Sequence, residues 1–266
     1  MTSEGIKALE SLSTEVTRLA EVVNEQEWSL PSACPGWNNH DVLIHFACTL
    51  REVVEPDSLP EPVPGSIERT NDVAVAQFRG ASISHTLDTY QRLIGPALEA
   101  LTALQNEPDG SEVVDFDDAG SYPAHLIVDS LVFDHYCHLR HDLASPRGRL
   151  TGLDIEVTDL VMRSSLTWLI AGLPQMSPRR LSATVTAPVA LKLTGPGGGM
   201  WTLTPAPNDG GVAIVEGSVD PAATITSTAD PFHLWGTHRG SRHDLDVALG
   251  GDAALASSVL DAIHVF

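Results

Sequence analysis

The change of hydrophobic period near Ser145–Gly148 constrains the fold of this chain more than any other feature. Before it, apolar residues recur every three or four positions, for example over residues 6–27, which is the spacing of an amphipathic helix. From residue 181 onward apolar and polar residues alternate, which is typical of strands. A single core also stops growing near this length of 266 residues. We therefore expect two domains, residues 1–148 and 149–266.

The first domain is predicted to be an antiparallel bundle of helices joined by loops. Asn38 is expected to cap the second helix, because Asp41 three residues later completes a variant of the capping box. The acidic run Asp115–Asp118 reads as a solvated loop. The helices are expected at residues 6–27, from 38 onward, at 71–79 and 84–104, and from Pro123 to about 142.

The second domain is predicted to be α+β, with an antiparallel sheet and its helices on one face. The glycine run Gly195–Gly199 has strand on both sides and lacks the spacing of a phosphate-binding loop, so it predicts a hairpin. The expected helices are 153–173, 230–237 and 252–263, and the expected strands are 181–186, 189–194, 200–204, 212–217 and 223–228.

Composition excludes some classes of partner. The formal net charge is −20, of which −15 falls in residues 1–150, so nucleic acid would be repelled and an anionic substrate would need an arginine or a metal ion. Cys34, Cys48 and Cys137 have no CxxC spacing and indicate free thiols of a reducing compartment. The sequence shows neither a signal peptide nor a membrane-spanning run, so we expect a cytoplasmic protein without a membrane partner.

The stretch Phe133–Asp142 holds three histidines and two aspartates in helix-compatible sequence. Asp134 and His138 are four residues apart and therefore share one helical face, which His141 and Asp142 continue. A carboxylate and an imidazole facing a bundle interior can provide two ligands to a divalent metal ion. The third ligand must come from elsewhere in the chain.

Purely structural roles for these histidines remain open. Histidines near a helix end often complement the helix dipole or satisfy a core hydrogen bond. His45, alone on an apolar helical face, is by itself more often a core residue than a ligand. If no metal binds, His45, Asp134 and His138 would form a buried polar network that is indifferent to chelators.

The segment Ser32–His45, with the sequence SACPGWNNHDVLIH, resembles the opening motif of the mycothiol-dependent maleylpyruvate isomerase family, within the DinB-like metalloproteins. The resemblance implies a DinB-like four-helix bundle whose metal is held by His45, Asp134 and His138. It also implies a C-terminal domain similar to sterol carrier proteins, with its cues in residues 198–203, 232–240 and 245–255. It thus covers nearly the whole chain.

This sequence departs from the family pattern at two positions. The family carboxylate is usually glutamate, and Asp134 is one methylene shorter. His141 stands where relatives often have an acidic residue, with Asp142 next, so His141 is a rival to His138. We expect Asp142 or His141 to orient a ligand imidazole. Arg79 and Arg239 are the candidate anchors for a dicarboxylate substrate.

The resemblance implies an enzyme that uses a bound divalent metal, most simply Zn²⁺, and a thiol such as mycothiol as cosubstrate. The expected reactions are isomerisation of a maleylpyruvate-type cis-enediacid and thiol S-transfer to an electrophile. The expected partners are therefore small molecules, and the protein a monomer or homodimer. The alternative is a non-catalytic metal- or small-ligand-binding protein of the same fold, because fold alone does not transmit substrate.

Overall fold

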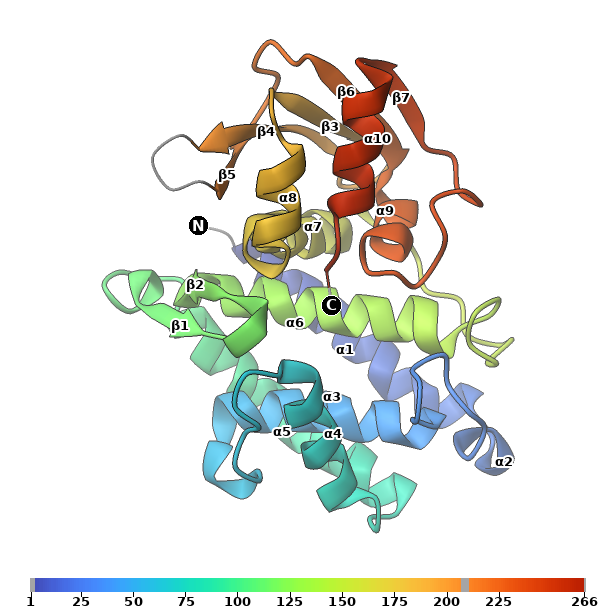
Figure 1. Ribbon diagram of the computed structural model, residues 1–266. Helices are drawn as coiled ribbons and strands as arrows, with labels where there is room; N and C mark the ends of the chain where they lie inside the picture. Colours follow the sequence, from blue (N-terminus) through green and yellow to red (C-terminus); the bar gives the residue numbers. More distant parts are fainter. Residues whose placement is uncertain (1–2, 207–210, 266) are drawn as a thin grey trace. The chain divides into compact units, whose positions relative to one another are not determined.

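The computed structural model describes residues 3–206 and 211–265 and divides the chain into two compact units, Met1–Glu156 and Val157–Phe266 (Figure 1). The division falls after the break at Ser145–Gly148 because the segment that follows the break packs on the first unit. Leu150 and Ile155 are buried, and Arg140 donates a hydrogen bond to the carbonyl of Ile155 at 2.6 Å.

The first unit is a helical bundle. Helix α1 packs against α5 and α6, α3 packs against α5, and α4 packs against α3 (Figure 1). The apolar stripe of α1 is buried, from Leu9 through Leu12 and Val16 to Leu19. The helices are α1 (Ser3–Val22), α2 (Glu25–Trp28), α3 (Asn39–Val54), α4 (Ile67–Phe78), α5 (Ile83–Ala103) and α6 (Ile127–Cys137), with 3₁₀ turns at Pro56–Ser58, Asp109–Ser111, Asp117–Ala119 and Ala124–Leu126 and a π-helix at His138–Leu143.

The start of α3 is fixed as its sequence predicts. The Asn38 side chain accepts a hydrogen bond from the Asp41 amide at 2.8 Å, and the Asp41 carboxylate accepts one from the Asn38 amide at 3.0 Å. This reciprocal capping box satisfies two backbone donors that a helix terminus leaves free. His45 is buried in the helix that begins here.

The acidic run 115–118 is more structured than a solvated loop. Strands β1 (Val113–Asp115) and β2 (Ser121–Pro123) form an antiparallel hairpin around it. Asp118 accepts a hydrogen bond from the amide of Ile67, the first residue of α4, at 2.9 Å. A carboxylate at a helix N-terminus is favourable because free amides and the helix dipole are positive there. The run therefore caps a helix that is distant in the sequence.

The second unit has a five-stranded sheet in the order β5-β4-β3-β6-β7. Helices α7 and α8 pack against β5, and α10 packs against β6 and β7 (Figure 1). The glycine run joins β3 to β4 as the predicted hairpin. The elements are α7 (Asp159–Met176), α8 (Pro178–Thr184), β3 (Val189–Thr194), β4 (Gly199–Ala206), β5 (Gly211–Glu216), β6 (Ala223–Thr228), α9 (Ala229–Gly236), β7 (Ala248–Gly251) and α10 (Ala253–Ala262).

Three details of the sheet differ from the prediction. The first predicted strand, at 181–186, is wrong: it lies mostly in α8, which starts at Pro178, a residue favoured at the first helical position. The sheet is mixed, because β3 and β6 are parallel while the other pairs are antiparallel. Strand β7 was not anticipated, since its four residues, Ala-Leu-Gly-Gly, are exposed and do not alternate.

In the part of the chain that the structure describes, we find no helix long and apolar enough to cross a bilayer.

Candidate metal centre

The three predicted metal ligands come together in the first unit. His45 lies on α3, Asp134 lies near the end of α6, and His138 begins the π-helix. His45 Nε2 is 2.8 Å from Asp134 Oδ1, and His138 Nε2 is 3.4 Å from the same oxygen. One ligand atom from each of the three residues lies within 4.8 Å of the other two. The structure thus joins a pair four residues apart to a histidine 89 residues away.

The donor set fits a divalent ion. Nitrogen and oxygen ligands of tetrahedral zinc lie about 3.3 Å apart, because each is about 2.0–2.1 Å from the metal. The two separations around Asp134 Oδ1 lie on either side of that value. The other oxygen, Oδ2, is buried; it lies 3.5 Å from His135 Nδ1 but makes no well-directed hydrogen bond with the residues that the structure describes. A buried carboxylate oxygen without a donor is costly, and a cation would remove that cost.

The electrostatics favour a neutral imidazole beside a carboxylate anion. Burial lowers the pKa of His45, although the adjacent Asp134 opposes this shift. Burial alone would raise the pKa of Asp134, but the nearby His45 and His138 outweigh it and hold that pKa well below its usual range. A metal-binding imidazole must be unprotonated and a ligand carboxylate ionised, so both shifts suit the role.

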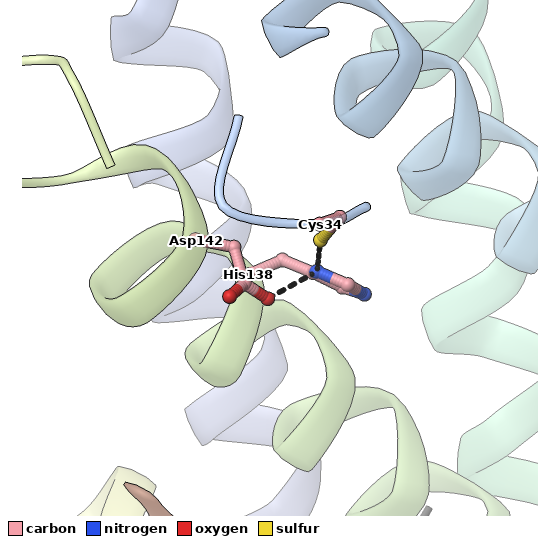
Figure 2. A group of neighbouring side chains, drawn as sticks. All are labelled: Cys34, His138 and Asp142. Carbon is pink, nitrogen blue, oxygen red and sulfur yellow. Dashed lines mark hydrogen bonds and ion pairs between the residues drawn. The ribbon is translucent and has the colours of Figure 1, made fainter. Parts of the chain in front are cut away.

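Asp142 lies behind His138. Its Oδ2 is 2.9 Å from His138 Nδ1 (Figure 2). Its Oδ1 accepts a hydrogen bond from Arg147 at 2.8 Å. Burial would lower the pKa of His138, but Cys34, Asp134 and Asp142 nearby raise it well above its usual range. Without a metal ion this raised pKa favours the protonated imidazole. A cation at Nε2 would displace the Nε2 proton, while Nδ1–H would go on donating its hydrogen bond to Asp142. Carboxylates commonly orient metal-binding histidines in this way.

The other histidines of the motif have different surroundings. His135 is fully buried, lies 3.1 Å from the Tyr90 hydroxyl and stacks on Phe46, so it is a core residue. His141 lies edge-on to Tyr136, with ring centroids 5.6 Å apart, and belongs to neither group of possible metal ligands found among the described residues. The π-helix changes the register after His138, and π turns occur often at functional sites.

A tight turn covers the imidazoles. The Trp37 amide donates to the Cys34 carbonyl at 3.2 Å, and Gly36 between them has φ +83°, as the third position of a type II turn requires. The Trp37 ring centre is 5.1 Å from that of His45 and 6.2 Å from that of His138, on which it stacks. This places a large apolar surface against the candidate ligands.

The two arginines proposed as substrate anchors have different surroundings. Arg79 pairs with the Asp41 carboxylate at 2.9 and 3.2 Å and donates to the carbonyl of Gly36 at 3.2 Å. It therefore ties the covering turn to the start of α3. Arg239 follows α9 in the second unit. A role for either arginine in binding substrate stays a prediction.

Three residues of the site had no role in the sequence-based prediction, which treated Cys34 only as a free thiol. Cys34 and Trp37 stand in the CPGW segment that carried the family resemblance, and Arg147 stands in the Ser145–Gly148 break. A Pro-Gly pair predicts a turn. The sequence could not show what the turn faces, because the Cys34 thiol contacts His138, which lies 104 residues further along the chain.

The first unit is thus a helical bundle with a two-histidine, one-carboxylate donor set, and the second is a small α+β unit. The family model of the mycothiol maleylpyruvate isomerase N-terminal domain matches residues 9–143. The chain belongs to that family.

Solved structures agree with this fold. The structure of the mycothiol-dependent maleylpyruvate isomerase aligns with a TM-score of 0.55 at 14% identity, over 94% of this chain and 96% of that one. A histidine-to-alanine mutant of that enzyme aligns with a TM-score of 0.53, the same identity and the same coverage. Identity this low establishes the likeness of fold alone. No curated protein matched the sequence.

Proposed function

We propose that this protein is a thiol-dependent enzyme whose divalent metal ion, most simply Zn²⁺, is held by His45, Asp134 and His138. The convergence of these three side chains, with Asp142 placed behind His138, is the observation that carries the proposal. Three protein ligands around a tetrahedral ion leave one position open, which distinguishes catalytic from structural zinc sites.

In this proposal each residue has a defined task. His45 and His138 offer Nε2 as metal ligands, and Asp134 offers Oδ1. Asp142 accepts a hydrogen bond from His138 Nδ1–H, and Arg147 in turn donates to Asp142. A divalent ion, when bound, would supply a positive charge that stabilises a thiolate at neutral pH, although a free thiol has a pKa of roughly 8.5. The expectation that His141 orients a ligand imidazole stays a prediction.

The proposed cosubstrate is a low-molecular-weight thiol of the mycothiol kind, and the proposed substrate is a maleylpyruvate-type cis-enediacid. The sulfur adds to one alkene carbon, and the carbon–carbon bond becomes single and rotates. Elimination then returns the thiol and the trans double bond, so no oxidant or reductant is consumed. S-transfer to an electrophile would use the same thiolate without the elimination step. Membership of the mycothiol maleylpyruvate isomerase family supports this chemistry.

The first test is metal content. Protein purified without a histidine tag is expected to hold near one equivalent of zinc, and His45→Ala almost none. His85→Ala is the matched control, because His85 is exposed on α5 and its substitution should leave the metal in place. Absence of metal from the parent protein, even after reconstitution with zinc, would refute the proposal. Metal-loaded protein would then be assayed with thiols and cis-enediacids.

A non-catalytic binding protein is the second candidate. A hollow of about 390 Å³ in the second unit, lined by Trp235, His238, Arg242 and Leu260 among others, favours it. Zinc binding without thiol-dependent turnover of any electrophile, together with ligand binding that Arg242→Ala weakens, would favour this candidate. Turnover that requires both thiol and metal would exclude it.

A further inference from the structure

A second group of possible metal ligands adjoins the first. Cys34 Sγ and Asp142 Oδ2 lie 3.4 Å and 2.9 Å from the same atom, His138 Nδ1 (Figure 2). One donor atom from each of the three residues lies within 4.8 Å of the others. His138 therefore faces the first group with Nε2 and this group with Nδ1.

This arrangement differs from a nucleophilic triad. In such a triad the histidine contacts the nucleophile with one ring nitrogen and the carboxylate with the other, so that a proton can pass across the ring. Here the thiol and the carboxylate both approach Nδ1. A single proton on that nitrogen cannot be shared fully with both. A cation in its place would contact the sulfur, the nitrogen and the oxygen together.

The spacing of the three atoms suits a tetrahedral cation. Sulfur and nitrogen ligands at about 2.3 and 2.0–2.1 Å from zinc lie ~3.5 Å apart. The observed separation between Cys34 Sγ and His138 Nδ1 is 3.4 Å. Asp142 Oδ2 would need to move only a few tenths of an ångström away from Nδ1, to about 3.3 Å. A thiolate in the set favours soft or borderline cations over Mg²⁺ or Ca²⁺.

Backbone contacts hold the cysteine in place. The amide of Ala33 donates to the carbonyl of Asp142 at 2.9 Å, which ties the turn directly to the π-helix. The Cys34 amide donates to the Ser32 hydroxyl at 3.1 Å. Cys34 is half-buried, whereas Cys48 and Cys137 are buried. The thiol is therefore both positioned and open to a cation from solvent.

We propose that Cys34, His138 and Asp142 form a second cation site for soft metal ions such as Cd²⁺, and that it competes with the first site for His138. The two groups approach opposite nitrogens of one ring, and a neutral imidazole offers a free lone pair on only one of its two nitrogens. A cation on Nδ1 therefore removes His138 from the first site. The competition rests on the proposed metal site; the second site itself does not.

Cadmium titration tests the site through the ultraviolet charge-transfer band of a thiolate–cadmium bond. The metal-free parent protein and Cys48→Ser, the matched control, are expected to develop the band at one equivalent, and Cys34→Ser is expected to lose it. A band that persists in Cys34→Ser would overturn the proposal, as would no band in the parent.

Two further variants separate the possible failures. Asp142→Asn should weaken cadmium binding at least about tenfold, as is usual for a lost carboxylate partner at a metal site. Unchanged affinity would mean that an accessible thiol binds alone, which overturns the three-residue site. His45→Ala should keep the band, because the second site does not use His45. A band in a parent protein that binds no zinc would leave the second site standing and refute the proposed function.

The competition has its own readout. When cadmium is added to zinc-loaded protein, we expect release of nearly one equivalent of zinc, measured with a colorimetric chelator. Cys34→Ser should retain most of its zinc under the same conditions. Formation of the band with full retention of zinc would show that the two sites fill independently and would refute the competition through His138.

Discussion

At the scale of single residues, the three cysteines differ sharply in environment. Burial raises the pKa of Cys48 to about 12, and Cys137 is only 1% exposed, whereas Cys34 lies in the half-buried turn. A thiol reacts as its thiolate and must be reached by the reagent. We therefore expect iodoacetamide to modify Cys34 in the native protein, and the other two cysteines only after unfolding. Peptide mass spectrometry would check this, and rapid native modification of Cys48 would contradict it.

The environment of His264 leads to a second prediction, which concerns the pH dependence of the unfolding free energy. Burial, followed by His238 and Arg180, lowers the pKa of His264. The unfolded chain therefore takes up a proton on this residue more readily than the folded one. The unfolding free energy is therefore undiminished at neutral pH. It falls as the pH drops through the pKa of this histidine in the unfolded chain, about 6.5, toward its lower pKa in the folded protein.

Urea unfolding at pH 7.5 and pH 5.5 measures this effect. The fall in unfolding free energy should be smaller for His264→Gln than for the parent protein. His243→Gln, which replaces an exposed histidine, should behave like the parent. An equal fall in His264→Gln and the parent would contradict the assignment.

At the scale of elements, the turn at Cys34–Trp37 depends on one glycine. A Cβ on Gly36 would meet no atom within 4 Å, but its φ of +83° is unfavourable for other residues. Gly36→Ala should therefore destabilise the protein by about 1–2 kcal/mol through backbone strain alone. Gly80→Ala, also without a neighbour within 4 Å but outside the left-handed region, is the control and should be nearly neutral. Equal effects of the two substitutions in chemical denaturation would contradict the role given to backbone strain.

The elements also show which features of the fold could be predicted from the sequence and which could not. The start of α3 was predictable because its capping box is local, and the pairing of Asp134 with His138 because it follows from helical spacing. The helix α8 was mistaken for a strand, because its short Leu-Ser-Ala-Thr-Val-Thr run alternates, and seven residues give too little length to reveal a helical period. The π-helix was not anticipated because a widened turn leaves no repeat in the sequence. His141 lies in this segment and belongs to neither group of possible ligands found among the described residues.

At the scale of the whole molecule, the candidate metal centre lies entirely within one of the two units. A ligand that binds only the native state stabilises what it binds. Zinc should therefore slow hydrogen exchange of amides in α3 and α6 and leave β3 and β6 unchanged, and a chelator should reverse the effect. Mass-spectrometric hydrogen exchange would check this. If the first unit showed no change with zinc, the three side chains would be a metal-free polar network.

The long-range contacts of the site have a consequence for how the protein is made. His45 meets Asp134 across 89 positions of the chain, and Cys34 meets His138 across 104. A ribosome that has released only the N-terminal helices therefore presents single imidazole and thiol groups, each a weak ligand. The first donor group is complete only after residue 138 has emerged, and the second only after residue 142. We therefore expect metal loading to follow synthesis of the helix that carries Asp134 and His138.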